Sequence, residues 1–309
     1  MNAPFHLAGE TAAVATAALW AMSALAWHLA GRRIGSVAVT TIRIAAATIV
    51  LATIHQLAFG SPWPTRMPIH AQKLLALSGI LGAGIGDLML FRSFQLIGPR
   101  LGMLMLSFSP ILATLLAGCI PPRENLGIQA ILGIVLTAAG VAWTVSEPTT
   151  HHTITPDRRL FRHGVLLALA SATCIGVSFL LTRRGLLAAG DGQAFSGTLV
   201  RVAAATVLCV AALPLLGRVR TVVDAVRDRK AMLIVAGGVV VGPVIGIWLS
   251  LVGFQYAPTG VTSALIGLSP IFMLPISRAV YGERPTMRAV IGTLLAVAGS
   301  ATLFLRATP

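Results

Sequence analysis

The sequence predicts an all-α integral membrane protein whose ten transmembrane helices form two five-helix repeats of inverted topology. The first reason is composition: 56% of the 309 residues are hydrophobic and only 10% are charged, whereas a soluble domain carries about 25% charged residues. The second is that the apolar residues gather in segments of roughly 20, which is the length that spans a bilayer as a helix. The third is an internal repeat with a period of about 160 residues.

The repeat is clearest near the middle of each half of the chain. Phe94–Gln95 returns as Phe254–Gln255, 160 residues later, and Ser109–Pro110 returns as Ser269–Pro270 at the same offset. A duplication of this length sets the architecture, because each copy encodes the same structural unit.

Ten apolar segments can be recognised, five in each copy. They cover residues 11–30, 36–58, 73–96, 99–119, 127–146, 163–182, 195–216, 231–253, 259–280 and 288–306. In lipid only helices and closed barrels satisfy the backbone, and these segments are too long and too uniformly apolar for barrel strands. We expect a short loop with at most one interfacial turn in the polar run from Arg218 to Lys230.

The two copies are expected to enter the membrane from opposite sides. We assign residues 1–148 to the first copy, 149–162 to a linker and 163–309 to the second copy. Because five spans per copy is an odd number, the second copy must start on the other face of the bilayer. Inverted repeats of this kind occur in secondary transporters, whose substrate site lies near the midplane between the repeats.

Small residues inside the spans favour close helix packing. Gly82, Gly84 and Gly86 lie in the third span, and Gly242 and Gly246 lie in the eighth. Small residues four apart let helix backbones approach each other. A nucleotide-binding loop is a poor interpretation of the first group, because no strand precedes it and a phosphate would lie within lipid.

The charge and the cysteines exclude several classes of function. The formal net charge is +14, but the basic residues lie mostly in short loops and helix ends, where they orient the chain and meet lipid headgroups rather than nucleic acid. The three cysteines Cys119, Cys174 and Cys209 fit no disulfide or metal spacing. We therefore expect neither a metal nor another cofactor.

Three ionisable residues lie well inside spans and are the first candidates for a substrate site. Arg43 and Arg201 occupy equivalent positions of the repeat, 158 residues apart. Each either snorkels to its own interface or lines a cavity and holds an anionic group of the substrate. Asp87 is the only acidic residue deep in a span, at a depth similar to that of Arg43, so we predict an ion pair that borders the cavity. Proton carriage by Asp87 is the alternative role.

The two Ser-Pro motifs are the second candidates. Ser109–Pro110 and Ser269–Pro270 fall near the centres of the fourth and ninth spans. Proline there leaves a carbonyl one turn earlier without its donor and bends the helix. Interrupted helices at corresponding positions of two halves indicate a transport site, although a purely structural kink is the alternative.

Three more residues complete the list of cavity candidates. Gln95 and Gln255 end their spans at equivalent positions, where they either line the mouth of a cavity or cap the helix end among headgroups. Trp20 lies in mid-span, away from the interface where tryptophan usually anchors, and so forms a cavity wall or packs against a neighbouring helix.

These motifs, in this order and twice over, resemble paired EamA domains of the drug/metabolite transporter superfamily. The second copy matches in Phe254–Ala257, in Leu268–Ile271 and in Gly282-Glu283-Arg284. The first copy matches in Leu19–Trp20, Arg43, Ser109–Pro110 and Glu124, but Arg123 stands where the family has glycine. The resemblance implies a ten-helix carrier of the bacterial inner membrane that exports amino acids, other small metabolites or drugs.

The expected partners are a small-molecule substrate and the lipid bilayer, with protons as a possible coupling ion and the chain acting as a monomer or homodimer. A channel or lipid scramblase and a membrane-embedded enzyme are the rival interpretations. Catalysis would need a cluster of acid, base and nucleophile, and Asp87 is the only deep acid. Charge bias between the loops places both termini outside the cell, whereas the resemblance places them inside, so both orientations stay open.

Overall fold

A computed structural model describes residues 3–119, 158–257, 259–281 and 286–302, together with 132–133, 135–136, 139–140 and 143. Within these residues the chain is helical and contains no strand. Six described helices or helix runs are long and apolar enough to cross a membrane: Ala8–Ile34, Ser36–Phe59, Ile69–Leu106, Arg158–Ala189, Ala194–Leu215 and Arg229–Tyr256. The protein is therefore a multi-pass membrane protein. The predicted fifth span, 127–146, lies mostly outside the described residues.

The first copy contains α1 (Ala3–Ile34), α2 (Ser36–Phe59), α3 (Ile69–Gly79), the π-helix η1 (Ile80–Gly86), α4 (Asp87–Leu106) and α5 (Phe108–Cys119). Glycine makes the sharp turns between them, because it adopts positive φ without a Cβ clash. Gly35 (φ +81°) separates α1 from α2, and Gly98 (φ +81°), followed by Pro99, breaks α4 near the predicted boundary between the third and fourth spans.

The second copy contains α7 (Arg158–Ala189), α8 (Ala194–Leu215), α9 (Val219–Ala225), α10 (Arg229–Val239), the π-helix η2 (Val240–Gly246), α11 (Ile247–Tyr256), α12 (Thr259–Ile266), α13 (Ser269–Tyr281) and α14 (Met287–Thr302). The polar run from Arg218 to Lys230 contains the seven-residue helix α9, which is longer than the single interfacial turn expected there. Helix α7 begins at Arg158, so residues 158–162, which we assigned to the linker, are helical.

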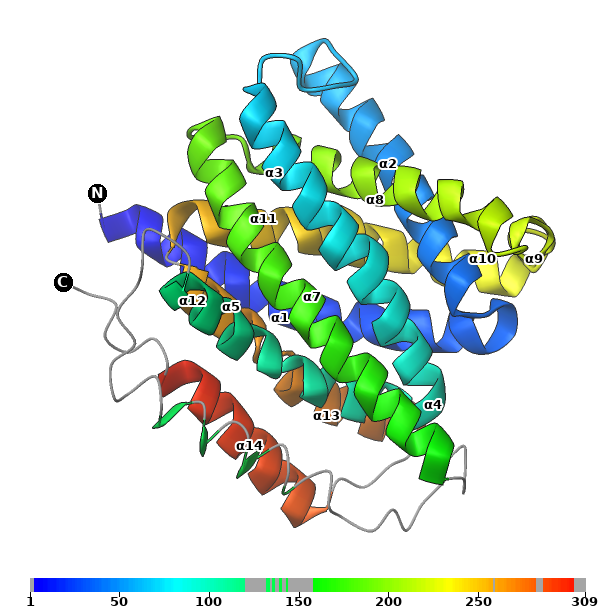
Figure 1. The fold of residues 1–309 in the computed structure, drawn as a ribbon, viewed down its shortest axis with the longest axis vertical. Coiled ribbons are helices and arrows are strands. Elements are labelled where there is room, and N and C mark those ends of the chain that lie inside the picture. Colours follow the sequence, from blue (N-terminus) through cyan, green and yellow to red (C-terminus); the bar gives the residue numbers. More distant parts are fainter. Residues whose placement is uncertain are drawn as a thin grey trace.

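The helices of the two copies pack in a reciprocal pattern (Figure 1). Helix α1 packs against α10, η2 and α11, and its counterpart α7 packs against α3, η1 and α4. Helices α2 and α8 contact each other directly, and the hydroxyls of Thr48 and Thr206 lie 2.9 Å apart across that contact. These two threonines are equivalent residues of the repeat, 158 positions apart.

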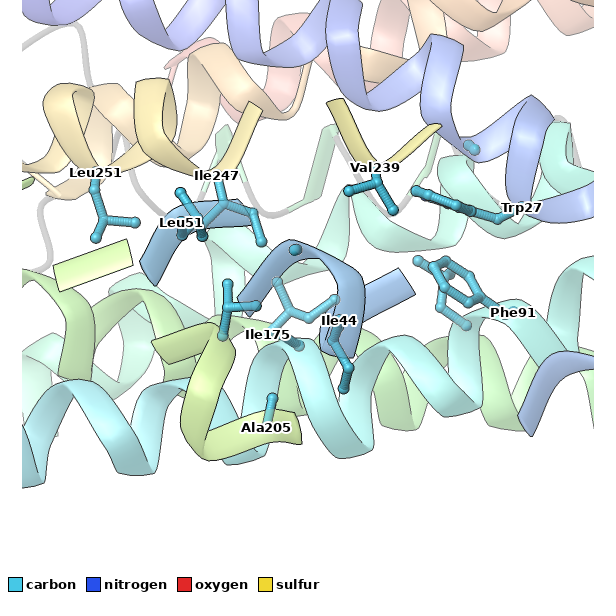
Figure 2. Close-up of a cluster of buried hydrophobic side chains, with 14 of the residues drawn as sticks. Trp27, Ile44, Leu51, Phe91, Ile175, Ala205, Val239, Ile247 and Leu251 are labelled. Atoms are coloured by element: carbon cyan, nitrogen blue, oxygen red, sulfur yellow. The ribbon is translucent and has the colours of Figure 1, made fainter. Parts of the chain in front are cut away.

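A large apolar cluster of described residues from both copies fills the space between them. Figure 2 shows Trp27 and Phe91 beside each other in this cluster, with ring centroids 6.0 Å apart. Glycine allows the closest helix contacts: a Cβ at Gly79 in α3 would lie 2.0 Å from the carbonyl oxygen of Arg201 in α8. Apolar side chains such as Leu57 (81% exposed) and Leu215 (88% exposed) point outward, as lipid-facing residues do.

Two irregularities recur in both copies. The π-helices η1 and η2 lie 160 residues apart, and at their ends Asp87 N–H donates to Gly82 O and Ile247 N–H to Gly242 O. The sequence predicts only close packing for these glycines, and the π-helices are an addition that the structure makes. The second irregularity is a helix break just before Pro110 and just before Pro270, after which α5 and α13 begin. These two breaks were expected from the sequence.

Candidate functional site

A cavity of about 640 Å³, a volume that includes its open mouth, lies between the two copies. Helices α1, α2, η1 and α4 contribute to its wall from the first copy, and α7, α8, η2 and α11 contribute from the second. Its aromatic lining consists of Trp20, Trp27, Phe91, Phe94 and Phe179. Small-molecule sites are mostly apolar and contain a few placed polar groups, and the lining of this cavity has that character. Here the charged groups among the lining residues are Arg43, Asp87 and Arg201.

Arg43 from α2 is held by an acid and two aromatic rings. Its guanidinium donates to a carboxylate oxygen of Asp87, so the predicted ion pair is confirmed. The same guanidinium lies 4.7 Å from the ring centroid of Phe91 and 5.3 Å from that of Trp27. A cation over aromatic faces is attracted by the ring quadrupole. Arg43 is 3% exposed and Asp87 20% exposed, so the pair borders the cavity with the carboxylate as its more accessible member.

Arg201 from α8 has hydroxyl partners instead. Its guanidinium donates to Thr182 Oγ1 and, over 3.2 Å, to Ser178 Oγ. Both hydroxyls use their own protons elsewhere, because Ser178 donates to Ser78 O (2.8 Å) and Thr182 donates to Ser178 O (2.7 Å). Their lone pairs are thus fixed toward the arginine. Arg201 is buried and lines the cavity, so neither arginine snorkels out to an interface.

A second, smaller cavity of about 260 Å³ adjoins the first and shares with it Trp20, Met103, Leu106 and Phe179. Ser109, Ser269 and Pro270 line it, so residues of both Ser-Pro motifs border the same cavity; their part in substrate binding stays a prediction. The side chain of Pro110 lies outside the described part of the structure.

The serine of the second Ser-Pro motif explains how the helix tolerates its break. Pro270 has no N–H to donate to Ile266 O, one turn earlier, and Ser269 Oγ donates to that carbonyl instead, over 2.6 Å. In the first copy, by contrast, the buried hydroxyls of Ser107 and Ser109 have no hydrogen-bond partner among the described residues. Both residues line the second cavity.

Gln95 and Gln255 were proposed as cavity residues, and the structure places both elsewhere. Gln95 Nε2 donates to His28 O (3.3 Å). Gln255 accepts from Ala194 N–H (3.1 Å) and donates to Gly190 O (3.2 Å). Neither side chain lines either cavity. The carboxamide of Gln255 joins the end of α11 to the turn between α7 and α8, which is the capping role, whereas that of Gln95 joins α4 to α1.

Sequence reasoning missed the hydroxyls that hold Arg201. Ser178 and Thr182 lie one turn apart on α7, and hydroxyls in apolar spans commonly satisfy backbone carbonyls, so they carried no functional signal. Their spacing, i and i+4 on one helical face, was the only clue. Within the described residues no three His, Cys, Asp or Glu side chains lie close enough together to hold a metal ion.

The chain is similar to known proteins over almost its whole length. The model of the EamA-like transporter family matches residues 7–146 and again residues 162–305. A solved structure, described only as a crystal structure of a protein, has a TM-score of 0.66 and 19% sequence identity, and covers 99% of each chain. At that identity the likeness concerns the fold alone. No curated protein matches the sequence.

Proposed function

The chain belongs to the EamA-like transporter family, and we propose that it is a secondary carrier that exports small metabolites such as amino acids or drugs. In this proposal the cavity between the copies opens alternately to the two sides of the membrane. The supporting observation is that both copies wall one cavity, which contains Arg43, Asp87 and Arg201 at the centre of an apolar bundle. Ionisable groups inside a membrane are costly and usually mark a substrate or ion pathway.

The proposal includes the ten-helix architecture, with residues 1–148 and 163–309 as two inverted repeats. The reciprocal packing of α1 and α7 supports it, because two halves related by a two-fold axis contact each other through equivalent surfaces. The contact between the equivalent residues Thr48 and Thr206 supports it further, since a residue meets its own counterpart only near such an axis.

We further propose the bacterial inner membrane as the location, a monomer or homodimer as the working form, and the proton as the coupling ion. Asp87 is the residue that would bind the proton, because it is the acid among the cavity-lining residues and is partly exposed there. Protonation of Asp87 would release Arg43 from its counter-charge.

Counterflow in proteoliposomes tests the carrier function. Purified protein is reconstituted with unlabelled solute inside, and entry of labelled solute is followed over a panel of amino acids, nucleosides, sugars, organic acids and cationic drugs. A carrier gives a transient accumulation of at least one solute, which Arg43→Gln abolishes. Arg227→Gln is the matched control, because Arg227 is exposed outside the cavity. Flux without counterflow would indicate a channel, and no flux for any solute would contradict the proposal.

A further inference from the structure

The two arginines of the cavity are equivalent in sequence but have different surroundings. Gly82 of η1 lies against Ser178, and the equivalent Gly242 of η2 lies against Ser23. One turn beyond each serine stands the residue that contacts the arginine, which is Trp27 for Arg43 and Thr182 for Arg201. The repeat therefore offers an aromatic face to the first guanidinium and a hydroxyl to the second.

The counter-ion differs as well. Asp87, which pairs with Arg43, is the first residue after η1, and its equivalent, the first residue after η2, is Ile247. Ile247 is apolar and also lines the cavity. Among the described residues no carboxylate contacts the guanidinium of Arg201, whose Nε has no hydrogen-bond partner at all. Two guanidiniums against one carboxylate leave the cavity lining with one positive charge in excess.

Resting on the carrier function above, we propose that Arg201 is the anion-binding subsite of the cavity and that the substrate is an amphipathic organic monoanion. Its carboxylate or similar group takes the place that an aspartate at position 247 would take. A charge in a low-dielectric wall draws an opposite charge strongly, and an arginine fork suits a planar carboxylate. Trp20 and Phe179, whose ring centroids lie 6.4 Å apart in the cavity wall, receive the apolar body.

Arg43 plays a different part in this proposal. It is already neutralised by Asp87 and covered by Trp27 and Phe91, so it fixes the wall rather than binding the anion. An acid at the position equivalent to Asp87 should consequently weaken anion binding, because Ile247→Asp supplies Arg201 with an internal carboxylate that competes with the anion.

Ligand-induced thermal shifts of the full chain in detergent test the proposal with three probes that share one ring and a fourth that lacks it. The probes are phenylacetate, its neutral amide phenylacetamide, the cation phenethylamine, and acetate, which lacks the ring. A ligand that binds the native state raises Tm, and at about ten times Kd we expect phenylacetate to raise it by about 2–4 °C. Acetate should give less, and the amide and the amine should give no shift.

Substitutions then show which residue binds the carboxylate of the probe. Arg201→Gln should weaken phenylacetate binding by roughly tenfold or more, because a charge-assisted hydrogen bond is lost, and Arg201→Lys should retain part of the affinity. Ile247→Asp should abolish the shift, and Ile247→Asn, a polar control of the same size without the charge, should preserve it. Each Tm without probe reports whether the variant folds, and Arg201→Lys against Arg201→Gln decides the matter if Ile247→Asp does not fold.

Several outcomes would overturn the assignment: an equal shift from the amide, a shift led by the amine, no shift from any probe, or an unchanged phenylacetate shift in Arg201→Gln. An equal shift from acetate would overturn the apolar-body part. These failures are distinguishable from failure of the carrier function. Counterflow of cations or neutral solutes, without any response to organic acids, would leave a carrier that does not use Arg201 for anions.

Discussion

Arg43 and Asp87 form a pair whose two members depend on each other for their charges. The guanidinium is nearly inaccessible, whereas the carboxylate is partly exposed to the cavity. A single charge left without its partner at this depth costs about 2.5–3.5 kcal/mol on membrane-insertion scales. The effect of removing one partner should therefore exceed the value of the pair itself.

Asp87→Asn should lower the free energy of unfolding by about 2 kcal/mol, because Arg43 is left charged without a carboxylate. It should also impair transport more than expression. The double variant with Arg43→Gln should recover part of the lost stability, since the unpaired charge is gone. Thermal unfolding of the purified single and double variants measures this coupling, and strictly additive losses would mean that the two residues do not interact energetically.

Gly79 allows helices α3 and α8 to approach each other closely. Gly79→Ala would place a methyl group 2.0 Å from the backbone oxygen of Arg201, so we expect a loss of about 1–3 kcal/mol as the helices separate. Gly237→Ala is the control, because nothing lies within 4 Å of its added carbon and alanine favours helix by about 0.5–1 kcal/mol. Equal effects of the two changes in thermal unfolding would show that this contact is not tight.

At the scale of helices, the sequence predicted the breaks before Pro110 and Pro270 and missed the two π-helices. Proline leaves a chemical mark, so the interruptions before Pro110 and Pro270 could be expected. The π-helices η1 and η2 leave less: Pro243 lies inside η2, but η1 contains no proline, and one extra residue in a turn changes neither hydropathy nor length detectably. The same limit applies to the site: the charge of Arg201 made it visible, whereas its hydroxyl partner Thr182 resembles any other threonine in a span.

The break between α12 and α13 lies just before Pro270. Pro270→Ala restores an N–H that can donate to Ile266 O, which would draw α12 and α13 into one helix. We expect thermal stability to be kept or raised and the transport rate to fall severalfold, because the cavity wall changes shape. Pro275→Ala, in the same helix but outside both cavities, is the control. Unchanged transport in Pro270→Ala would assign the break a purely structural role.

Asp228 caps the N-terminus of α10 and ties it to the end of α1. Ala231 N–H donates to one carboxylate oxygen (3.0 Å) and Arg33 to the other (2.8 Å), and these bonds, the first most strongly, hold the pKa of Asp228 below its usual value. A carboxyl with a lowered folded-state pKa stabilises the fold above its unfolded pKa, and this stability is lost as pH falls through the folded pKa. Asp228→Asn should thus lower Tm at neutral pH, with the difference vanishing in acid. A pH-independent difference would contradict this.

At the scale of the whole molecule, inverted topology places equivalent loops on opposite sides of the membrane. Gly60 ends α2 and Gly217 follows α8, both with positive φ, so Ser61 and Arg218 begin equivalent loops. In a cysteine-free background, Ser61→Cys and Arg218→Cys should react with an impermeant maleimide from opposite sides. One should label in intact cells and the other only after permeabilisation, which also gives the orientation of the chain. Labelling of both from one side would contradict inverted repeats.

The residues after the two π-helices show what covalent fusion of two copies allows. A pair of identical subunits must carry the same side chain at both symmetric positions, so its cavity would hold either two aspartates or two isoleucines there. In one continuous chain Asp87 and Ile247 are separate codons and can drift apart. The duplicated gene can therefore keep a symmetric scaffold and still place an acid beside only one of the two equivalent positions in the cavity. A homodimer of a single copy could not encode that difference.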